Sequence, residues 1–248
     1  MNTDSPSPGP TITGRPGRSA RDWGLWGGLA PIAALLLCAG FVLGAALRPV
    51  FLQGATAGVT LLVLIAALAA LGHRAMKRVG RHDRGAEGEE RTARFLEHLP
   101  TGWYVYHGVP LSGAAGGGRD IDHIAAGPGG VFLIETVNWT GRITLEDGHL
   151  LDNGQAYEGY AIEDFRARAE AMADALEKDG GVRPKVRPVF CAAGGRLAAM
   201  PDAPKDLLIC EPSELVRQLT AAGDTLSVEA LSRCNRALAR LVGASMDG

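Results

Sequence analysis

Two long uncharged runs dominate the pattern of hydrophobic positions in the first third of the chain. The first, WGLWGGLAPIAALLLCAGFVLGAAL, covers residues 23–47, and the second covers residues 50–72, with Arg48 and Pro49 between them. At about 1.5 Å per helical residue, each run is long enough to cross a hydrocarbon layer roughly 30 Å thick. The pattern therefore predicts a two-helix transmembrane hairpin. Two alternatives stay open, a cleaved signal peptide and a buried helical hairpin of a soluble protein.

Beyond residue 84 the hydrophobic spacing becomes that of a globular α/β domain. Helical spacing predicts helices over residues 87–99, 158–178 and 212–219, and a last helix that begins near Ser227. Alternating or continuous apolar runs predict strands over 103–109, 121–125, 131–138, 185–192 and 207–210, with a hairpin over 142–151. The order of elements predicts a central sheet that mixes parallel and antiparallel strands, flanked by helices.

The flanking segments set the expected domain organisation. Residues 1–22 are rich in Pro, Gly, Ser and Thr and are expected to be disordered, whereas 73–84 form a basic juxtamembrane linker. The globular domain is expected over 85–220, followed by a C-terminal helix and tail over 221–248. Positive charges on both sides of the hairpin place both termini and the domain in the cytoplasm, as a multi-pass protein of the cytoplasmic membrane.

The composition and charge of the chain argue against several classes of function. A formal net charge of −2 argues against a strongly basic protein that coats nucleic acid. The four cysteines form no CxxC pair, so buried reduced thiols are expected in place of a zinc site or a disulfide framework. The chain has no GxxxxGK[ST] phosphate loop. Since the two spans contain no acidic or basic residue, a transport pathway through them is poorly supported.

Three acids are the candidate functional residues. Glu135 lies in the middle of the apolar run VFLIETVNW, Asp122 lies in RDIDH at the start of a short strand, and Glu89 lies at the start of the first predicted helix of the domain. A carboxylate inside an apolar strand is costly unless it is paired or bound to a metal. Two carboxylates on neighbouring strands suit Mg²⁺, which also binds water and phosphate oxygens. A cation is expected two residues beyond Glu135, on the same strand face, but Val137 is found there.

Each acid also has a simpler interpretation. Asp122 would cap a backbone amide in a turn, Glu135 would form a buried ion pair with an arginine, and Glu89 would favour a helix N-terminus through the helix dipole. His123 would point away from Asp122 on a strand and is expected to be structural.

The motifs resemble a known family. GxxGE at Gly85–Glu89, DIDH at Asp120–His123 and GPGGVFLIETxNWxG from Gly127 to Gly141 are similar to the nuclease-related domain, NERD. The similarity covers roughly residues 85–219, and Gln155 also fits a glutamine of that family. NERD is similar to the PD-(D/E)xK restriction-endonuclease-like nucleases. The resemblance implies a restriction-endonuclease-like fold, with Asp122 and Glu135 as ligands of Mg²⁺ or Mn²⁺ and Glu89 as an accessory acid.

The sequence departs from the family at one position, because the family pattern has lysine where this chain has Val137. Arg142, Arg119 or Gln155 would have to take over its role. The resulting expectation is a membrane-anchored, metal-dependent endonuclease or phosphodiesterase that acts on DNA or RNA. The alternative is a catalytically degenerate nuclease fold that serves as a nucleic-acid or protein binding module.

Overall fold

A computed structural model describes residues 9–17, 84–109, 120–200 and 203–246, together with scattered residues between 33 and 74. The chain divides into two compact units, residues 1–18 with 87–248 and residues 19–86. The predicted spans 23–47 and 50–72, and most of the linker 73–84, lie largely outside the described residues. Among the residues that are described, no helix combines the length and the apolar character needed to cross a bilayer.

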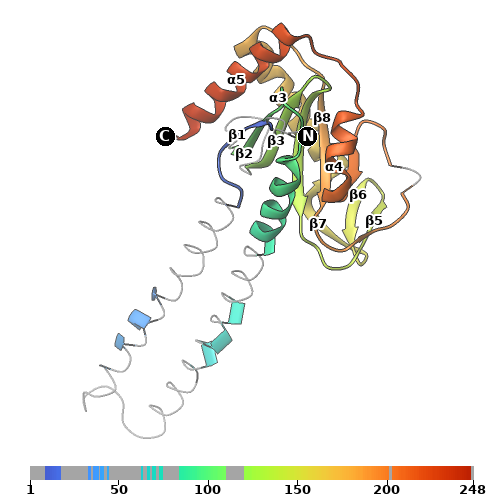
Figure 1. The fold of residues 1–248 in the computed structure, drawn as a ribbon. Coiled ribbons are helices and arrows are strands. Elements are labelled where there is room, and N and C mark those ends of the chain that lie inside the picture. Colours follow the sequence, from blue (N-terminus) through green and yellow to red (C-terminus); the bar gives the residue numbers. More distant parts are fainter. Residues whose placement is uncertain are drawn as a thin grey trace, which may run out of the picture. The chain divides into compact units, whose positions relative to one another are not determined.

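A mixed six-stranded sheet forms the centre of the first unit (Figure 1), in the order β1-β2-β3-β4-β8-β10. The strands are β1 (Thr11–Thr13), β2 (Tyr104–Val109), β3 (Ile121–Gly127), β4 (Gly130–Val137), β8 (Val186–Ala192) and β10 (Leu208–Cys210). β2, β3 and β4 pair antiparallel, whereas β8 is parallel to β4 and β10 is parallel to β8. The predicted α/β fold with a mixed central sheet is confirmed.

Helices cover both faces of this sheet. They are the helix over residues 84–96, α3 (Ile162–Gly180), α4 (Pro212–Thr220) and α5 (Val228–Met246). On one face, Leu133 of β4 packs in a core cluster with Met172 of α3 and Leu238 of α5. On the other face, Phe132 packs in a cluster with Leu96 and with Leu215 of α4. Successive residues of β4 thus enter different layers of the core, as alternation along a strand requires.

The C-terminal helix belongs to the same unit as the sheet. Leu231, Cys234 and Leu238, predicted to face inward, are buried in the structure, and Leu241 packs against the same cluster while only partly buried. α5 therefore completes one layer of the same unit.

A second sheet of four strands follows the first, in the order β7-β6-β5-β9. Its strands are β5 (Arg142–Glu146), β6 (His149–Asp152), β7 (Gln155–Ala161) and β9 (Arg196–Leu197). The prediction of a helix from residue 158 is wrong for its first turn, because the backbone of residues 155–161 pairs with β6. Asn153 and Gly154 have φ values of 51° and 78° and form the two-residue connection between β6 and β7.

The expectation of disorder over residues 1–22 needs correction for residues 11–17. Thr11–Thr13 form β1, which pairs parallel with Tyr104–Tyr106 of β2. Farther along, the buried Gly17 donates its N–H to Glu89 Oε2 at 2.8 Å. Composition alone missed this segment because its partners, an open sheet edge and a buried carboxylate, lie far away in the sequence.

Candidate active site

Asp122 and Glu135 lie on neighbouring strands. His123 of β3 pairs with Ile134 of β4, so the same register brings Asp122 beside Glu135. The Thr136 N–H donates to Asp122 Oδ2 at 2.6 Å, which fixes the aspartate at the end of β3. The side chain of Glu135 is only 3% exposed. The structure therefore brings together the two acids that the sequence singled out as metal ligands, with Asp122 half-buried and Glu135 deep in the core.

Glu135 forms a buried ion pair with Arg168 of α3. Arg168 Nη1 lies 2.5 Å from Glu135 Oε1, and the arginine side chain is 7% exposed. The guanidinium carbon lies 5.3 Å from the centroid of the Phe165 ring, within the range of a cation–π contact. Within the described part of the chain, Arg168 Nη2 is buried and has no hydrogen-bond partner. The simpler interpretation of Glu135, a buried ion pair with an arginine, is confirmed.

Sequence reasoning missed Arg168, although a signal was present. Phe165, Ala169 and Met172 mark the inward face of the helix, and position 168 falls on that same stripe, three residues after Phe165. A charged residue on an inward helical stripe requires a buried partner. That requirement pairs it with the acid inside β4.

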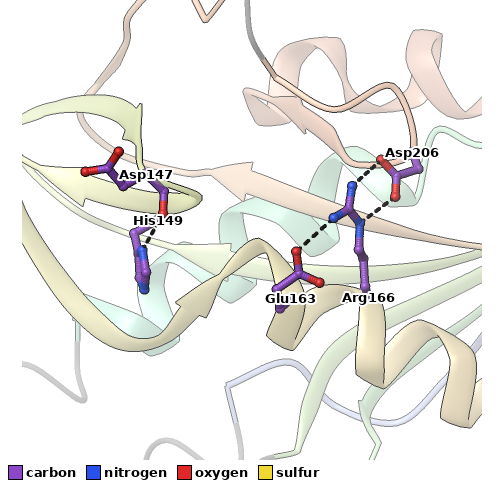
Figure 2. Close-up of polar contacts among 5 residues, drawn as sticks. All are labelled: Asp147, His149, Glu163, Arg166 and Asp206. Atoms are coloured by element: carbon purple, nitrogen blue, oxygen red, sulfur yellow. Dashed lines mark hydrogen bonds and ion pairs between the residues drawn. The ribbon is translucent and has the colours of Figure 1, made fainter.

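Arg166, also on α3, forms exposed ion pairs. Arg166 lies between Glu163, at 2.9 Å, and Asp206, at 2.7 Å and 3.0 Å, as Figure 2 shows. Its side chain is 37% exposed, and those of its partners are more exposed still. Arg166 therefore provides a matched comparison for Arg168 on the same helix.

Val137 occupies an apolar environment. It is 3% exposed and belongs to a core cluster with Ile143, Phe165 and Phe190. Phe165 thus contacts the Arg168 guanidinium and also shares a cluster with Val137. The positive charge near Glu135 comes from α3 and not from the position two residues farther along β4.

Glu89 lies in the helix over residues 84–96 and is 7% exposed. Burial, together with the charges of Asp122 and Asp120, raises the pKa of the Glu89 carboxyl to about 8, against the opposing effect of the Gly17 N–H. Glu89 is therefore within electrostatic range of Asp122. In the described residues, however, no group of three or more His, Cys, Asp and Glu side chains is arranged to hold a metal ion. Asp122 and Glu135, which lie opposite each other on paired strands, remain the two carboxylates predicted to bind a metal.

The remaining candidates lie elsewhere in the fold. Gln155 begins β7 and Arg142 begins β5, both in the second sheet and both exposed. Arg119 lies outside the described residues. His123 is fully buried, and its Nδ1 lies 2.7 Å from Nδ1 of His107. Burial lowers the pKa of both imidazoles, that of His107 to about 4, so the pair is neutral at pH 7 and structural.

The donor set fits a hard divalent cation. Mg²⁺ is commonly held by one or two carboxylates, with water and phosphate oxygens completing its shell. The raised pKa of Glu89 shows that Asp122 and Asp120 add unfavourable negative charge here, which a cation would relieve. Arg168 is the competing cation, since it already contacts Glu135.

Comparison with known proteins identifies one family. The family model of the nuclease-related domain, NERD, matches residues 84–193. The match covers less than half of the chain, so this segment is similar to NERD domains. It contains Glu89, Asp122, Glu135 and Arg168, whereas β10, α4 and α5 follow it in the chain. The resemblance inferred from the motifs is thereby confirmed for the segment.

An uncharacterized protein of Bacillus anthracis is 39% identical over 83 residues, which cover 33% of this chain. The chain spans 39% of the length of that relative. No solved structure gives a significant match.

Proposed function

We propose that the NERD domain is a divalent-metal-dependent phosphodiesterase that acts on DNA or RNA. We also propose that Arg168 supplies the positive charge missing at Val137. The observation that carries the proposal is the contact of Arg168 Nη1 with Glu135 Oε1 at 2.5 Å, beside Asp122. Asp122 and Glu135 would hold Mg²⁺ or Mn²⁺. When bound, such an ion stabilises negative charge on a phosphoryl oxygen and lowers the pKa of water.

Arg168 suits the role of a phosphate-binding cation. A guanidinium remains protonated and presents a planar set of N–H donors that matches a phosphate, so it stabilises charge but accepts no proton. Phe165 and the backbone oxygen of Asp164 hold the side chain in place. Nη2 is buried and its N–H donors contact no described acceptor, so they would pair with a phosphate once the site opens to admit it.

A second candidate function is a non-catalytic binding module on a nuclease fold. The observation that favours it is the combination of Val137 in an apolar cluster with an ion pair already formed at Glu135. In that case Arg168 replaces the metal permanently, and the domain binds nucleic acid or protein without turnover.

Cleavage assays distinguish the phosphodiesterase from the non-catalytic binding module. The full chain in detergent would be incubated with plasmid, single-stranded DNA and RNA in the presence of Mg²⁺, Mn²⁺ or EDTA. The variants are Glu135→Gln, Arg168→Met and Val137→Lys, with Arg166→Met as the matched control. We expect metal-dependent cleavage that Glu135→Gln and Arg168→Met reduce by roughly 10²-fold or more and that Arg166→Met leaves intact. A wild type that binds nucleic acid but cuts none, with activity appearing only in Val137→Lys, would establish the binding module.

We further propose that residues 23–72 anchor the domain at the cytoplasmic face of a membrane. The two uncharged runs of this segment, 23–47 and 50–72, support the proposal. Four of its described positions, Leu36, Leu37, Phe41 and Val63, are helical and between 62% and 79% exposed. Apolar side chains exposed together are typical of a surface that contacts another apolar phase.

A further inference from the structure

A groove of about 630 Å³ lies where the chain passes from the first sheet to the second. β4 and β8 are parallel neighbours in the first sheet, with Val137 beside Ala192. Their continuations, β5 and β9, are again parallel neighbours in the second sheet. The groove is lined by residues just after these two crossings, including Thr140, Arg142 and Arg196, and by Asn153 of the turn between β6 and β7.

Two arginines stand side by side in this groove. Arg142 is the register partner of Arg196 across β5 and β9, and both are exposed. Like charges on directly opposed positions of a sheet are destabilising. In the part of the chain that the structure describes, neither side chain forms an ion pair with an acid. Two adjacent guanidinium groups without a described counter-charge are suited to bind an anion.

A second groove is also lined by arginines, but these arginines are paired with acids. This groove, of about 520 Å³, contains Arg166 and Arg183. Arg166 is paired with Glu163 and Asp206, and Arg183 with Glu170, Asp174 and Glu177. Its arginines are therefore already neutralised, whereas those of the β5–β9 groove are not.

The backbone around Arg142 and Arg196 is tightly held. The Arg142 N–H donates to Asn153 Oδ1 at 3.0 Å, and the Asn153 N–H donates to the Arg142 carbonyl at 2.9 Å. The Arg196 N–H donates to the Gly141 carbonyl at 2.9 Å. A Cβ on Gly141 would lie 2.0 Å from Asn153 Nδ2, so only glycine allows this approach. The two strand starts are thus fixed by bonds that leave the guanidinium groups unused.

The groove is also close to the acid pair along the chain. Arg142 follows Glu135 by seven residues on one continuous segment, which spans at most about 25 Å when extended. One strand of B-form DNA rises roughly 3.4 Å per nucleotide. A backbone that places one phosphate at Asp122 and Glu135 therefore reaches the groove within about seven nucleotides.

We propose that the β5–β9 groove binds a backbone phosphate of a nucleic-acid strand, held between Arg142 and Arg196, a few nucleotides from the acid pair. The choice of nucleic acid rests on the proposed function of the domain. Arg142 is then a substrate-positioning residue and does not replace the missing lysine at Val137.

The test measures binding separately from cleavage. The full chain in detergent would be titrated into a fluorescent 12-nucleotide single-stranded DNA in EDTA, at several salt concentrations, with anisotropy as the readout. The variants are Arg142→Gln, Arg196→Gln and their combination, with Arg183→Gln as the matched control. We expect each single change to weaken binding several-fold and to lower the salt slope by about 0.7, and the control to do neither.

The groove proposal is overturned if the double variant binds with wild-type affinity and salt slope, if the control weakens binding equally, or if the wild type binds no DNA. Glu135→Gln should keep the binding and lose the cleavage. If the wild type cuts nothing but binds DNA through the two arginines, the groove proposal is supported and the phosphodiesterase proposal is contradicted. If the double variant cleaves with an unchanged KM, the phosphodiesterase proposal is supported and the groove proposal is contradicted.

Discussion

Glu135 and Arg168 stabilise each other, because each alone would be an unpaired charge in the core. Both side chains are less than 10% exposed, and their closest atoms lie 2.5 Å apart. Removing one member of such a pair is far more costly than removing both, since the single change leaves a buried charge without a counter-charge. The pair therefore couples the chemistry of the site to the stability of the domain.

A double-mutant cycle tests this coupling. Arg168→Met should lower the free energy of unfolding by about 3–5 kcal/mol, and Glu135→Leu combined with Arg168→Met should recover most of that loss. Arg166→Met, which removes two exposed ion pairs, should cost far less than Arg168→Met. Thermal unfolding followed by circular dichroism would measure these variants, Glu135→Leu alone and the wild type. Additive effects of the two core changes would show that the pair is not energetically coupled.

Glu89 gives the domain a pH dependence with a definite sign. Its carboxyl has a pKa of about 8 in the folded protein, against an ordinary value of 4.5. The folded state therefore holds a proton that the unfolded state releases between these values, and the associated stability is lost as pH rises from about 4.5 to 8. Glu89→Gln keeps an oxygen for the Gly17 N–H and cannot ionise. It should be more stable than wild type at pH 8, on the order of a few kcal/mol, and nearly equal at pH 4.5.

Unfolding temperatures of wild type and Glu89→Gln, measured between pH 4.5 and 8.5, check this expectation. Glu87→Gln, on the same helix, is the control, because Glu87 is exposed and is not among the groups that shift the pKa of Glu89. Parallel profiles for wild type and Glu89→Gln would mean that Glu89 ionises normally in the folded state.

Among the elements, those with a strong local pattern were predictable from the sequence. The apolar run of β4 and the inward stripe of α5 appear where the spacing indicated, because burial of one face determines both. β7 was missed because its pairing depends on the Asn153-Gly154 turn, and the residues after it also suit a helix. β1 was missed for a related reason, because it depends on a partner distant in sequence, which local periodicity does not reveal. For Glu135, a buried ion pair with an arginine was among the interpretations, but Arg168 was not identified as that arginine.

The attachment of β1 can be tested through one glycine. Gly14 has a φ of 93°, and a Cβ there would lie 2.4 Å from the His107 carbonyl oxygen of β2. Gly102 has a similar φ of 90°, but a Cβ there would meet nothing within 4 Å. Gly14→Ala should therefore detach β1, whereas Gly102→Ala adds only backbone strain of roughly 1–2 kcal/mol. Limited proteolysis near residues 9–17 should be faster in Gly14→Ala alone; equal rates in both variants would argue against close docking of β1.

At the scale of the whole molecule, the chain combines a segment similar to NERD domains with an apolar segment that precedes most of it. If residues 23–72 anchor the protein, it should stay with membranes through alkaline extraction and need detergent for release. Replacing Leu36, Leu37 and Phe41 by Asp should release it into the soluble fraction, because each charge is costly in a bilayer. The triple change Leu36→Ala, Leu37→Ala and Phe41→Ala is the control and should remain bound. Wild-type protein in the alkaline supernatant would rule out an integral anchor.

The sheet of this domain is assembled from two stretches of chain that lie on either side of residues 19–86. β1 precedes residues 19–86 in the chain and pairs with β2, which follows them. In the same way, Gly17 precedes this segment and donates to Glu89, which follows it. A single cut within that segment would therefore yield two fragments that remain associated, as in a split reporter protein. A force that displaced the N-terminal fragment would expose the edge of β2 and remove the Gly17 N–H donor from the buried carboxylate of Glu89. Mechanical load or proteolysis upstream of the domain would then change the protonation of Glu89.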